Sequence, residues 1–543
     1  MSAQLADHFD VIIIGAGING AGIARDAALR GLRVLLLDKG DLSAGTSAWS
    51  TRLIHGGLRY LEHGEVSLVR ESLRERELLL RHAPHLVRPL SMLIPIYAHA
   101  RRGPLTIRAG MLAYDLLSFD KSLDRHRMLS REETIKRAPG LAQRGLLGAA
   151  LYYDAQVEYA ERLVLENVLD ARESGASVRT YARVDRLLLE HNRVAGVRFT
   201  DLLEGIGGQV ARAPLTVNVS GPWVDQLTGA TLNNSTPRLV GGTKGSHLIV
   251  RRFEGAPPDA LYVEAAADAR PFFIIPWNSL YLIGTTDRRF DGDLDHLAAD
   301  DDEIDYLLRE TRRVIPSAEL TRDDILYTYS GVRPLPYAGD ASEKSITRRH
   351  FIHDHAASVA GANGLAGLVS IVGGKLTTYR HLAEQAVDLI FRKLDRKSPP
   401  CETHSRPLPG ARTTDFRAFS EEFKKRSALP ASVNQRLLRI YGTRAQEVLA
   451  LALAEDDLRE PFSPETGAIG AEVLFAFREE MARTLADCLM RRTMVGLGPS
   501  LGFGDDERAA LIAQKYLGWS KNFAQSKVEA YRKARGGGDS VRD

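Results

Sequence analysis

The sequence predicts an α/β fold followed by an all-helical C-terminal domain, and three observations support this prediction. An apolar, β-branched run from Val11 to Ile14 ends at a cluster of glycines and is followed by a small-residue segment of helical character. Strand-like and helix-like segments then alternate up to about residue 393, whereas beyond residue 413 only helical patterns remain. Because 543 residues exceed what one hydrophobic core supports, we expect more than one domain.

The glycines after the first predicted strand form the pattern G-x-G-x-x-G with Gly15, Gly17 and Gly20. Gly15 permits a tight turn, Gly17 lets the backbone approach a pyrophosphate at the helix N-terminus, and Gly20 lets helix and strand pack closely. A second apolar run, 34–37, ends at Asp38, whose carboxylate can accept hydrogen bonds from ribose hydroxyls. The combination predicts a dinucleotide site. An ordinary glycine turn in a βαβ unit is the alternative.

Composition argues against several classes of protein. The 72 basic and 69 acidic residues leave a net charge of +3, too small to predict binding to nucleic acid. Cys401 and Cys488 have no metal-type spacing, so we expect neither a disulfide framework nor a metal site. The first nine residues lack the pattern of a secretory signal, and no apolar run is long enough to span a bilayer. We therefore expect a cytoplasmic protein, free or bound to a membrane surface.

Periodicity indicates the order of elements along the chain. Helices are expected at 64–82 (amphipathic and exposed), at 159–173 and from about 377 to 393. After Gly175 the pattern predicts a β-meander with a turn at 191–192, then a strand at 209–219. Further strands are expected at 247–250, 272–276, 281–284 and near 370.

The C-terminal part changes in character. Residues 394–413 are rich in proline and polar residues and predict a linker, followed by charged helices at about 414–427, 430–455, 468–493 and 505–534. We divide the chain into a cofactor-binding domain (mainly 9–90, 150–225 and 345–393) interwoven with a substrate β domain (mainly 91–149 and 226–344) within residues 1–393. The linker and a helical domain at 414–543 follow.

Longer motifs add a resemblance to a known family. They are GAGINGAGIARDAALRG (15–31), GTSAWSTRLIHGGLRYLEHGE (45–65), NVSGPWVD (218–225), KGSHLIV (244–250), IIPW and LIGTTD (274–287), YSGVRPL (329–335), ITR (346–348) and GGKLTTYRHLAE (373–384). With them the chain resembles the FAD-dependent, quinone-linked glycerol-3-phosphate dehydrogenases, closely over residues 9–390 and more loosely beyond. The resemblance implies a glutathione-reductase-type FAD-binding Rossmann domain, an interwoven antiparallel β substrate domain and a helical C-terminal domain.

The resemblance implies noncovalent FAD. In the loop at 45–57, hydroxyls can reach phosphate or ribityl oxygens and paired glycines can lie against a flat ring. The segment GGKLTTYR opens a helix whose N-terminus suits the anionic edge of a reduced flavin. The expected cofactor-binding residues are Gly15, Gly17, Ile18, Asn19, Gly20, Asp38, Thr46, Ser47, Ser50, Gly56, Gly57, Ser220, Gly221, Gly374, Lys375, Leu376 and Thr377.

The substrate implied by the resemblance is glycerol 3-phosphate, oxidised to dihydroxyacetone phosphate by hydride transfer from C2 to flavin N5. Its phosphate suits arginine forks. The expected substrate-binding residues are Arg59, Tyr60, Arg333, Arg348 and Lys375, and the expected catalytic residues are His247, Arg333 and Lys375. His247 is the candidate base, with a buried structural histidine as the alternative.

The family passes its electrons to a membrane quinone, which implies a peripheral protein on the inner leaflet of the cytoplasmic membrane. Residues 101–127 contain an amphipathic pattern with Leu105, Leu112, Leu116 and Leu123 on one side. Core packing explains this stripe equally well, and a homodimer is left open. The alternatives in function are a glycerol-3-phosphate oxidase that uses O₂, a glycine- or sarcosine-type amine oxidase, and a nucleotide-binding protein without turnover.

Overall fold

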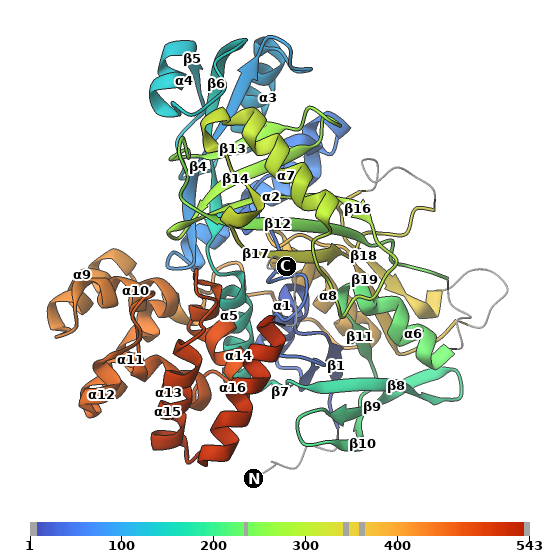
Figure 1. Cartoon of the computed structure of the whole chain (residues 1–543). Helices are drawn as coiled ribbons and strands as arrows, with labels where there is room; N and C mark the ends of the chain where they lie inside the picture. The colour runs from blue at the N-terminus through green and yellow to red at the C-terminus, as the bar shows by residue number, and fades with distance from the viewer. Residues whose placement is uncertain (1–7, 233–236, 340–346, 358–363, 537–543) are drawn as a thin grey trace.

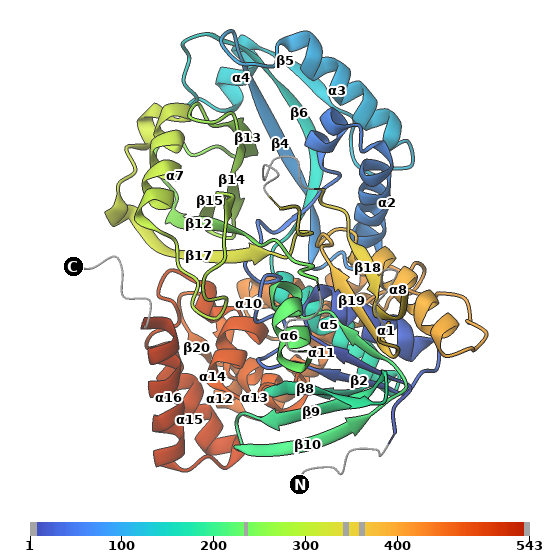
Figure 2. The same cartoon turned by 90° about the vertical axis from the view of Figure 1, so that its right-hand side faces the viewer.

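The computed structural model describes residues 8–232, 237–339, 347–357 and 364–536, so the N-terminal residues examined for a secretory signal lie mostly outside it. Within these ranges a parallel sheet, a larger mixed sheet and a group of C-terminal helices form the molecule (Figure 1). Figure 2 shows the large sheet at the top and the parallel sheet with its helices below it. The expected α/β class with a helical C-terminal domain is confirmed.

The parallel sheet has the strand order β18-β19-β11-β1-β2-β7 in the described residues, with only β18 antiparallel to its neighbour. Val11 and Ile13 pack with helices α1, α5 and α8, whereas Ile12 and Ile14 pack with the meander on the other face, as alternation along a strand requires. The bounds are β1 (Val11–Ile14), α1 (Ile18–Leu29), β2 (Val34–Leu37), α5 (Ala160–Glu173), β7 (Ser177–Arg179), β11 (Thr216–Asn218), α6 (Val224–Leu232), β18 (Phe351–Asp354), β19 (Leu368–Val372) and α8 (Tyr379–Lys393).

The predicted meander is confirmed as β8 (Ala182–Glu190), β9 (Arg193–Asp201) and β10 (Ile206–Arg212), paired antiparallel. The single strand expected at 209–219 is wrong. Its first part is the end of β10, and its second part is β11 of the parallel sheet. Pro214 lies between them, and because proline has no N–H it does not continue a hydrogen-bonded ladder.

The large sheet brings together strands from three separate stretches of the chain. Strands β4 and β6 pair along their whole lengths, although the predicted domain boundaries near residues 90 and 150 cut through both. The division into domains therefore stays a prediction. The bounds are β3 (Leu53–Ile54), β4 (Val87–Tyr97), β5 (Arg127–Ser130), β6 (Leu146–Val157), β12 (Thr243–Arg251), β13 (Ala260–Glu264), β14 (Pro271–Trp277), β15 (Leu280–Gly284), β16 (Arg288–Arg289) and β17 (Ile325–Arg333), with helices α2 (Val66–His82), α3 (Pro104–Leu117), α4 (Arg131–Arg137) and α7 (Asp301–Val314).

The C-terminal helices are shorter than the periodicity predicts. Gly442 and Gly518, both at positive φ, end helices inside two of the expected long segments, because a left-handed residue terminates a helix. Two short strands, which the sequence did not indicate, also occur there. The bounds are α9 (Phe416–Arg426), α10 (Ala431–Tyr441), α11 (Ala445–Ala454), α12 (Asp456–Arg459), β20 (Pro461–Ser463), β21 (Ala468–Ile469), α13 (Gly470–Arg478), α14 (Leu485–Asp487), α15 (Asp505–Leu517) and α16 (Lys521–Gly536).

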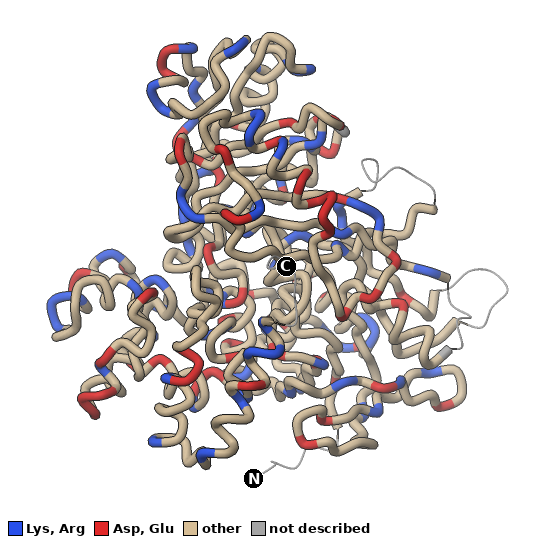
Figure 3. The backbone as a smooth tube through the Cα atoms, in the orientation of Figure 1, with Lys and Arg blue, Asp and Glu red and all other residues tan. Residues whose placement is uncertain are grey.

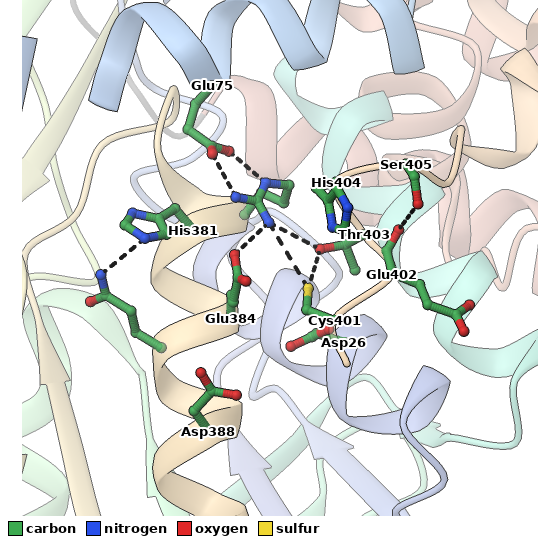
Figure 4. A network of polar contacts seen from close by, with 12 residues as sticks. Asp26, Glu75, His381, Glu384, Asp388, Cys401, Glu402, Thr403, His404 and Ser405 are labelled. Carbon is green, nitrogen blue, oxygen red and sulfur yellow. Dashed lines mark hydrogen bonds and ion pairs between the residues drawn. The ribbon is translucent and has the colours of Figure 1, made fainter. Parts of the chain in front are cut away.

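Helix α2 forms where it was expected, but much of its charged surface is buried, so its predicted exposure is wrong. Arg76 donates to Asp154 of β6 at 2.5 Å. Glu75, Glu384 and Thr403 surround one guanidinium group (Figure 4). It belongs to Arg380 of α8, which donates to Glu75 at 2.7 and 2.6 Å. Periodicity gave no sign of these pairs, because their partners are distant in sequence.

Helix α3 starts at Pro104, a favoured first position, and ends before Leu123. Met111 and Tyr114 face the interior, whereas Leu105, Leu112 and Leu116 are 82%, 57% and 74% exposed. Core packing therefore does not explain this stripe. The helix presents a row of large apolar side chains to solvent, which is unusual for a monomeric surface.

Replacing Arg380 with leucine is expected to destabilise the protein by about 3–5 kcal/mol, because Glu75 would remain buried without its partner. Arg212→Leu is the control, since Arg212 and its partner Glu190 are each about half exposed, and its cost is expected to stay within about 1 kcal/mol. Urea unfolding followed by circular dichroism measures both. Equal losses for the two variants would contradict the role given to the buried pair.

Candidate active site

One cavity of about 3000 Å³ is lined by residues of both sheets. Single small-molecule sites measure about 300–1,000 Å³, so the space suits a large cofactor together with a substrate. Nearly all the predicted site residues line this cavity. The exceptions are Gly20 and Gly56, which lie beneath its surface.

The glycine turn is built for close packing. Gly15 has a φ of +111°, and a side chain there would meet the carbonyl oxygen of Val219 at 2.7 Å. A side chain on Gly20 would come within 1.8 Å of the Gly15 carbonyl oxygen. Helix α1 begins at this turn without a side-chain cap from its N-cap residue Gly17. The N-terminus of α1 therefore offers backbone N–H groups and the positive end of its dipole to the cavity.

Asp38 stands at the end of β2, on the cavity wall. Its two carboxylate oxygens accept hydrogen bonds from the backbone N–H groups of Ala16 (2.6 Å) and Gly40 (2.8 Å). Burial raises the pKa of the Asp38 carboxyl. The carboxylate thus joins the glycine turn to the loop after β2, in the position where the motif predicts ribose contacts.

The hydroxyls predicted to bind the cofactor differ in whether their protons are already donated within the protein. Ser47 accepts from the N–H of Ile18 at 2.9 Å, which leaves its own proton free for a phosphate oxygen. Thr46 donates to the Val332 carbonyl at 2.7 Å, and Ser220 donates to Asn218 at 2.7 Å. The structure therefore favours Ser47 over Thr46 and Ser220 as a phosphate donor.

The two adjacent glycines of this loop differ in whether they line the cavity. Gly57 has a φ of +78° and lies against the Tyr60 ring, on the cavity wall. Gly56 lies deeper, and its N–H donates to the hydroxyl of Tyr114 at 2.9 Å. Tyr114 in turn donates to Asp154 at 2.8 Å. Tyr114 of helix α3 and Asp154 of strand β6 thus fix the backbone of the loop at Gly56.

Opposite the glycine turn, three arginines converge on one carboxylate. Asp287 accepts from Arg333 at 3.1 Å and from Arg348 at 3.0 Å, and Arg270 lies 3.8 Å away. Burial alone would raise the pKa of the Asp287 carboxyl, but Arg333 and Arg348 hold it below its usual value. Nη1 of Arg348 is buried and has no hydrogen-bond partner among the described residues. The cluster has an excess of positive charge and an unused donor, which together fit an anion.

This positive charge is local. Figure 3 shows basic and acidic residues interspersed through the sheets and the C-terminal helices. Arg59 and Tyr60, which the sequence also assigns to the substrate, line the same cavity.

Lys375 lies at the turn before α8. Its Nζ donates to Ser72 Oγ at 3.1 Å and sits 3.8 Å from the centre of the Tyr60 ring. Burial lowers the pKa of Lys375 to about 7, even though Glu71 and Glu65 act in the opposite direction. At neutral pH the amine is therefore close to half protonated, so it can bind an anion or accept a proton.

Two histidines face the cavity. His247 on β12 is buried, lies 2.9 Å from Thr51 Oγ1 through Nε2, and stacks against Tyr329. Burial, and then Arg333 and Arg52, place the pKa of His247 well below its usual value, so the ring is neutral. His55, which we did not single out, also lines the cavity, and burial lowers its pKa to about 4.

Comparisons with known proteins identify the family. Residues 10–380 match the family model described as FAD dependent oxidoreductase, and residues 401–523 match the C-terminal domain of alpha-glycerophosphate oxidase. A glycerol-3-phosphate dehydrogenase of Synechocystis sp. is 47% identical over 96% of this chain and 95% of its own length. The chain belongs to the FAD-dependent glycerol-3-phosphate dehydrogenase family. An aerobic glycerol-3-phosphate dehydrogenase of Staphylococcus haemolyticus is 33% identical over 90% of this chain and 87% of its own length.

Solved structures agree with this assignment. The crystal structure of a glycerol-3-phosphate dehydrogenase from Bacillus halodurans, complexed with FAD, is 27% identical, covers 97% of this chain and 95% of its own chain, and has a TM-score of 0.78. The FAD-bound L-alpha-glycerophosphate oxidase of Mycoplasma pneumoniae is 17% identical, covers 74% of this chain and 100% of its own, and has a TM-score of 0.55. The second likeness shows the shared fold only.

The residues of this chain fit FAD, the cofactor of the family. The α1 N-terminus and the Ser47 hydroxyl supply donors for a pyrophosphate, and Asp38 supplies acceptors for a ribose. Gly57 and the turn from Gly374 to Thr377 also present backbone to the cavity, where a flat ring could lie against it. The individual ligand contacts of these residues stay predictions.

Sequence reasoning missed Asp287, Arg270 and His55. Asp287 ends the segment LIGTTD and His55 opens HGG, so both stood inside motifs that carried the resemblance. Nothing local distinguishes Arg270 from a surface arginine, because its role depends on the approach of β14 to the Asp287 segment.

The lowered pKa of Lys375 can be measured directly. After reductive methylation with ¹³C-formaldehyde, we expect one dimethyl-lysine NMR signal to titrate near pH 7, because burial favours the neutral amine. The signal should be absent in Lys375→Arg. A spectrum in which every methyl signal titrates in the usual lysine range, about pH 10, would contradict this environment.

Proposed function

We propose that this protein oxidises sn-glycerol 3-phosphate to dihydroxyacetone phosphate, with FAD as the hydride acceptor. The observation that carries this proposal is the arginine cluster on Asp287, where Arg348 keeps a buried donor that has no partner among the described residues. A phosphate dianion offers several acceptor oxygens to such a cluster. The relatives named glycerol-3-phosphate dehydrogenase support the same substrate.

FAD supplies the two-electron chemistry, and the residues of this chain supply binding and proton transfer. Arg333 and Arg348 bind the phosphate and so fix the position of the substrate carbons. Lys375, with a pKa of about 7, accepts the proton of the C2 hydroxyl in its neutral form. His247 stays the alternative base, although its low pKa makes it a weaker acceptor.

An amine oxidase acting on glycine or sarcosine is less well supported. A substrate carboxylate has two oxygens, and one bidentate arginine satisfies it. Arg333 and Arg348 on Asp287, with Arg270 shared between Asp287 and Asp268, provide more positive charge than such a substrate needs.

For the electron acceptor we propose a membrane quinone, reached from the cytoplasmic face of the membrane. No helix in the described ranges combines the length and apolar character needed to cross a bilayer. The exposed row Leu105, Leu112 and Leu116 instead suits a helix lying in the interface, with Arg101 and Arg108 exposed beside it for anionic headgroups. Oxygen is the alternative acceptor, and anaerobic assays of quinone reduction against peroxide formation distinguish the two.

Arg333→Met and Arg348→Met are each expected to raise KM for glycerol 3-phosphate by about 10- to 100-fold, the loss of one sheltered charge-assisted bond. Steady-state kinetics with a dye acceptor measure this change. Arg426→Met, at an exposed site on α9, is the control and should leave KM unchanged. Unchanged KM values in both site variants would contradict the phosphate assignment.

Leu112→Glu combined with Leu116→Glu is expected to abolish sedimentation of the protein with vesicles of anionic lipid, because both carboxylates would enter the interface. Leu511→Glu provides a matched control, since Leu511 is 62% exposed on a different helix, α15. Binding that survives the double change would show that another surface meets the membrane.

A further inference from the structure

The loop that carries Ser47 starts at a buried ion cluster with the C-terminal helical domain. Asp41 is 1% exposed, and its carboxylate accepts from Arg491 Nε at 2.6 Å and from Arg492 at 2.5 and 2.9 Å. Both arginines belong to the C-terminal domain, where the turn Cys488–Arg492 is π-helical. A π-helical turn is rare and occurs frequently at functional sites.

From Asp41 the loop runs directly onto the N-terminus of α1. Ser43 donates its N–H to the Ala16 carbonyl at 3.0 Å, and Ser47 Oγ accepts from Ile18 at 2.9 Å. At the far end of the loop, Arg52 forms a bidentate pair with Glu161 of α5, at 2.8 and 2.7 Å. One end of the loop is therefore fixed by the cofactor domain itself and the other end by the C-terminal domain.

A second attachment reaches the Asp38 segment. Asp487 of α14 accepts from the hydroxyl of Tyr181 at 2.6 Å. The N–H of Tyr181 donates to the Gly40 carbonyl at 2.9 Å, and that of Ala182 donates to the Asp38 carbonyl at 2.7 Å. Residues 487–492 of the C-terminal domain thus contact the loop at Asp41 directly and reach the Asp38 segment through Tyr181.

The ion cluster of Asp41, Asp487, Arg491 and Arg492 is buried and contains charged groups. Burial would raise the pKa of Asp41, but Arg492 and Arg491 hold it at about 2, so the carboxylate stays ionised at neutral pH. Arg491 also bonds Asp487 at 3.0 Å. Removing Arg491 would leave the buried Asp41 carboxylate with Arg492 as its remaining arginine partner, and the loop would be expected to shift as the ion cluster rearranges.

We propose that the C-terminal helical domain retains FAD, with Arg491 and Arg492 as positioning residues that fix the loop between Asp41 and Ser47 against the α1 N-terminus. These arginines act through Asp41 and do not touch the cofactor. This role depends on the FAD site and not on the substrate, so it can fail while the proposed oxidation of glycerol 3-phosphate stands, and the reverse.

The test measures FAD release from the full-length holoprotein on dilution, followed by the rise in free flavin fluorescence. Arg491→Gln is expected to raise the Kd for FAD by about tenfold, since a charge-assisted bond that orders the site is lost. Arg532→Gln is the control: Arg532 pairs with the buried Asp506 at 2.7 and 3.1 Å, and both residues belong to the C-terminal domain. We expect it to lower the thermal midpoint while leaving the Kd unchanged.

A milder pair of variants keeps the test decisive if Arg491→Gln does not fold. Tyr181→Phe removes the bond to Asp487, and Tyr441→Phe removes an equivalent tyrosine–carboxylate bond to Glu472, 3.0 Å long, within the C-terminal domain. A rise in the FAD Kd of about threefold or more, confined to Tyr181→Phe, supports the proposal. If both pairs lower the thermal midpoint alike and every folded variant keeps the wild-type Kd, the contacts are structural only and the proposal is overturned.

Discussion

The carboxylate of Asp287 allows three guanidinium groups to share one partly buried corner of the cavity. Without it, Arg333, Arg348 and Arg270 would repel one another. Arg270 also pairs with Asp268, so among the described residues two carboxylates face three guanidinium groups, and the corner keeps an excess of positive charge that an anionic ligand would relieve. The proposed function places the anion in this corner and the oxidised carbon near Lys375, so the same arrangement would set the size of the substrate.

The rest of the molecule serves to hold two walls of the cavity at a fixed separation. The walls come from different sheets, and buried ion pairs between remote segments join the parts around them. Arg76 joins α2 to the large sheet, Arg380 joins α8 to α2, and Arg492 joins the C-terminal domain to the loop after β2. Buried pairs are costly to leave half made, so they favour one arrangement over alternatives.

The sequence predicts an element of the fold well when neighbouring residues determine that element. The β1–α1–β2 unit follows from neighbouring residues, because Gly15 and Gly20 act within a few ångströms of their own turn. The meander and α8 follow from periodicity for the same reason. The separation of β10 from β11 and the helix breaks at Gly442 and Gly518 were missed, since the periodicity continues across them.

The site residues likewise divide into those that a local motif predicts and those that depend on tertiary contacts. Arg333 and Lys375 stood in motifs, but Asp287 gains its importance only when three distant arginines converge on it. Likewise, the leucines of α3 fitted a core as well as a membrane until the structure placed them in solvent. Charge convergence and exposure are tertiary properties, and no spacing in one sequence reveals them.

The most direct test of the proposed activity is the visible absorption of the purified holoprotein under anaerobic conditions. Addition of glycerol 3-phosphate is predicted to bleach the flavin band, whereas glycerol at the same concentration should leave it unchanged. A flavin that stays oxidised with saturating glycerol 3-phosphate, or one that glycerol bleaches equally well, would contradict the proposed activity.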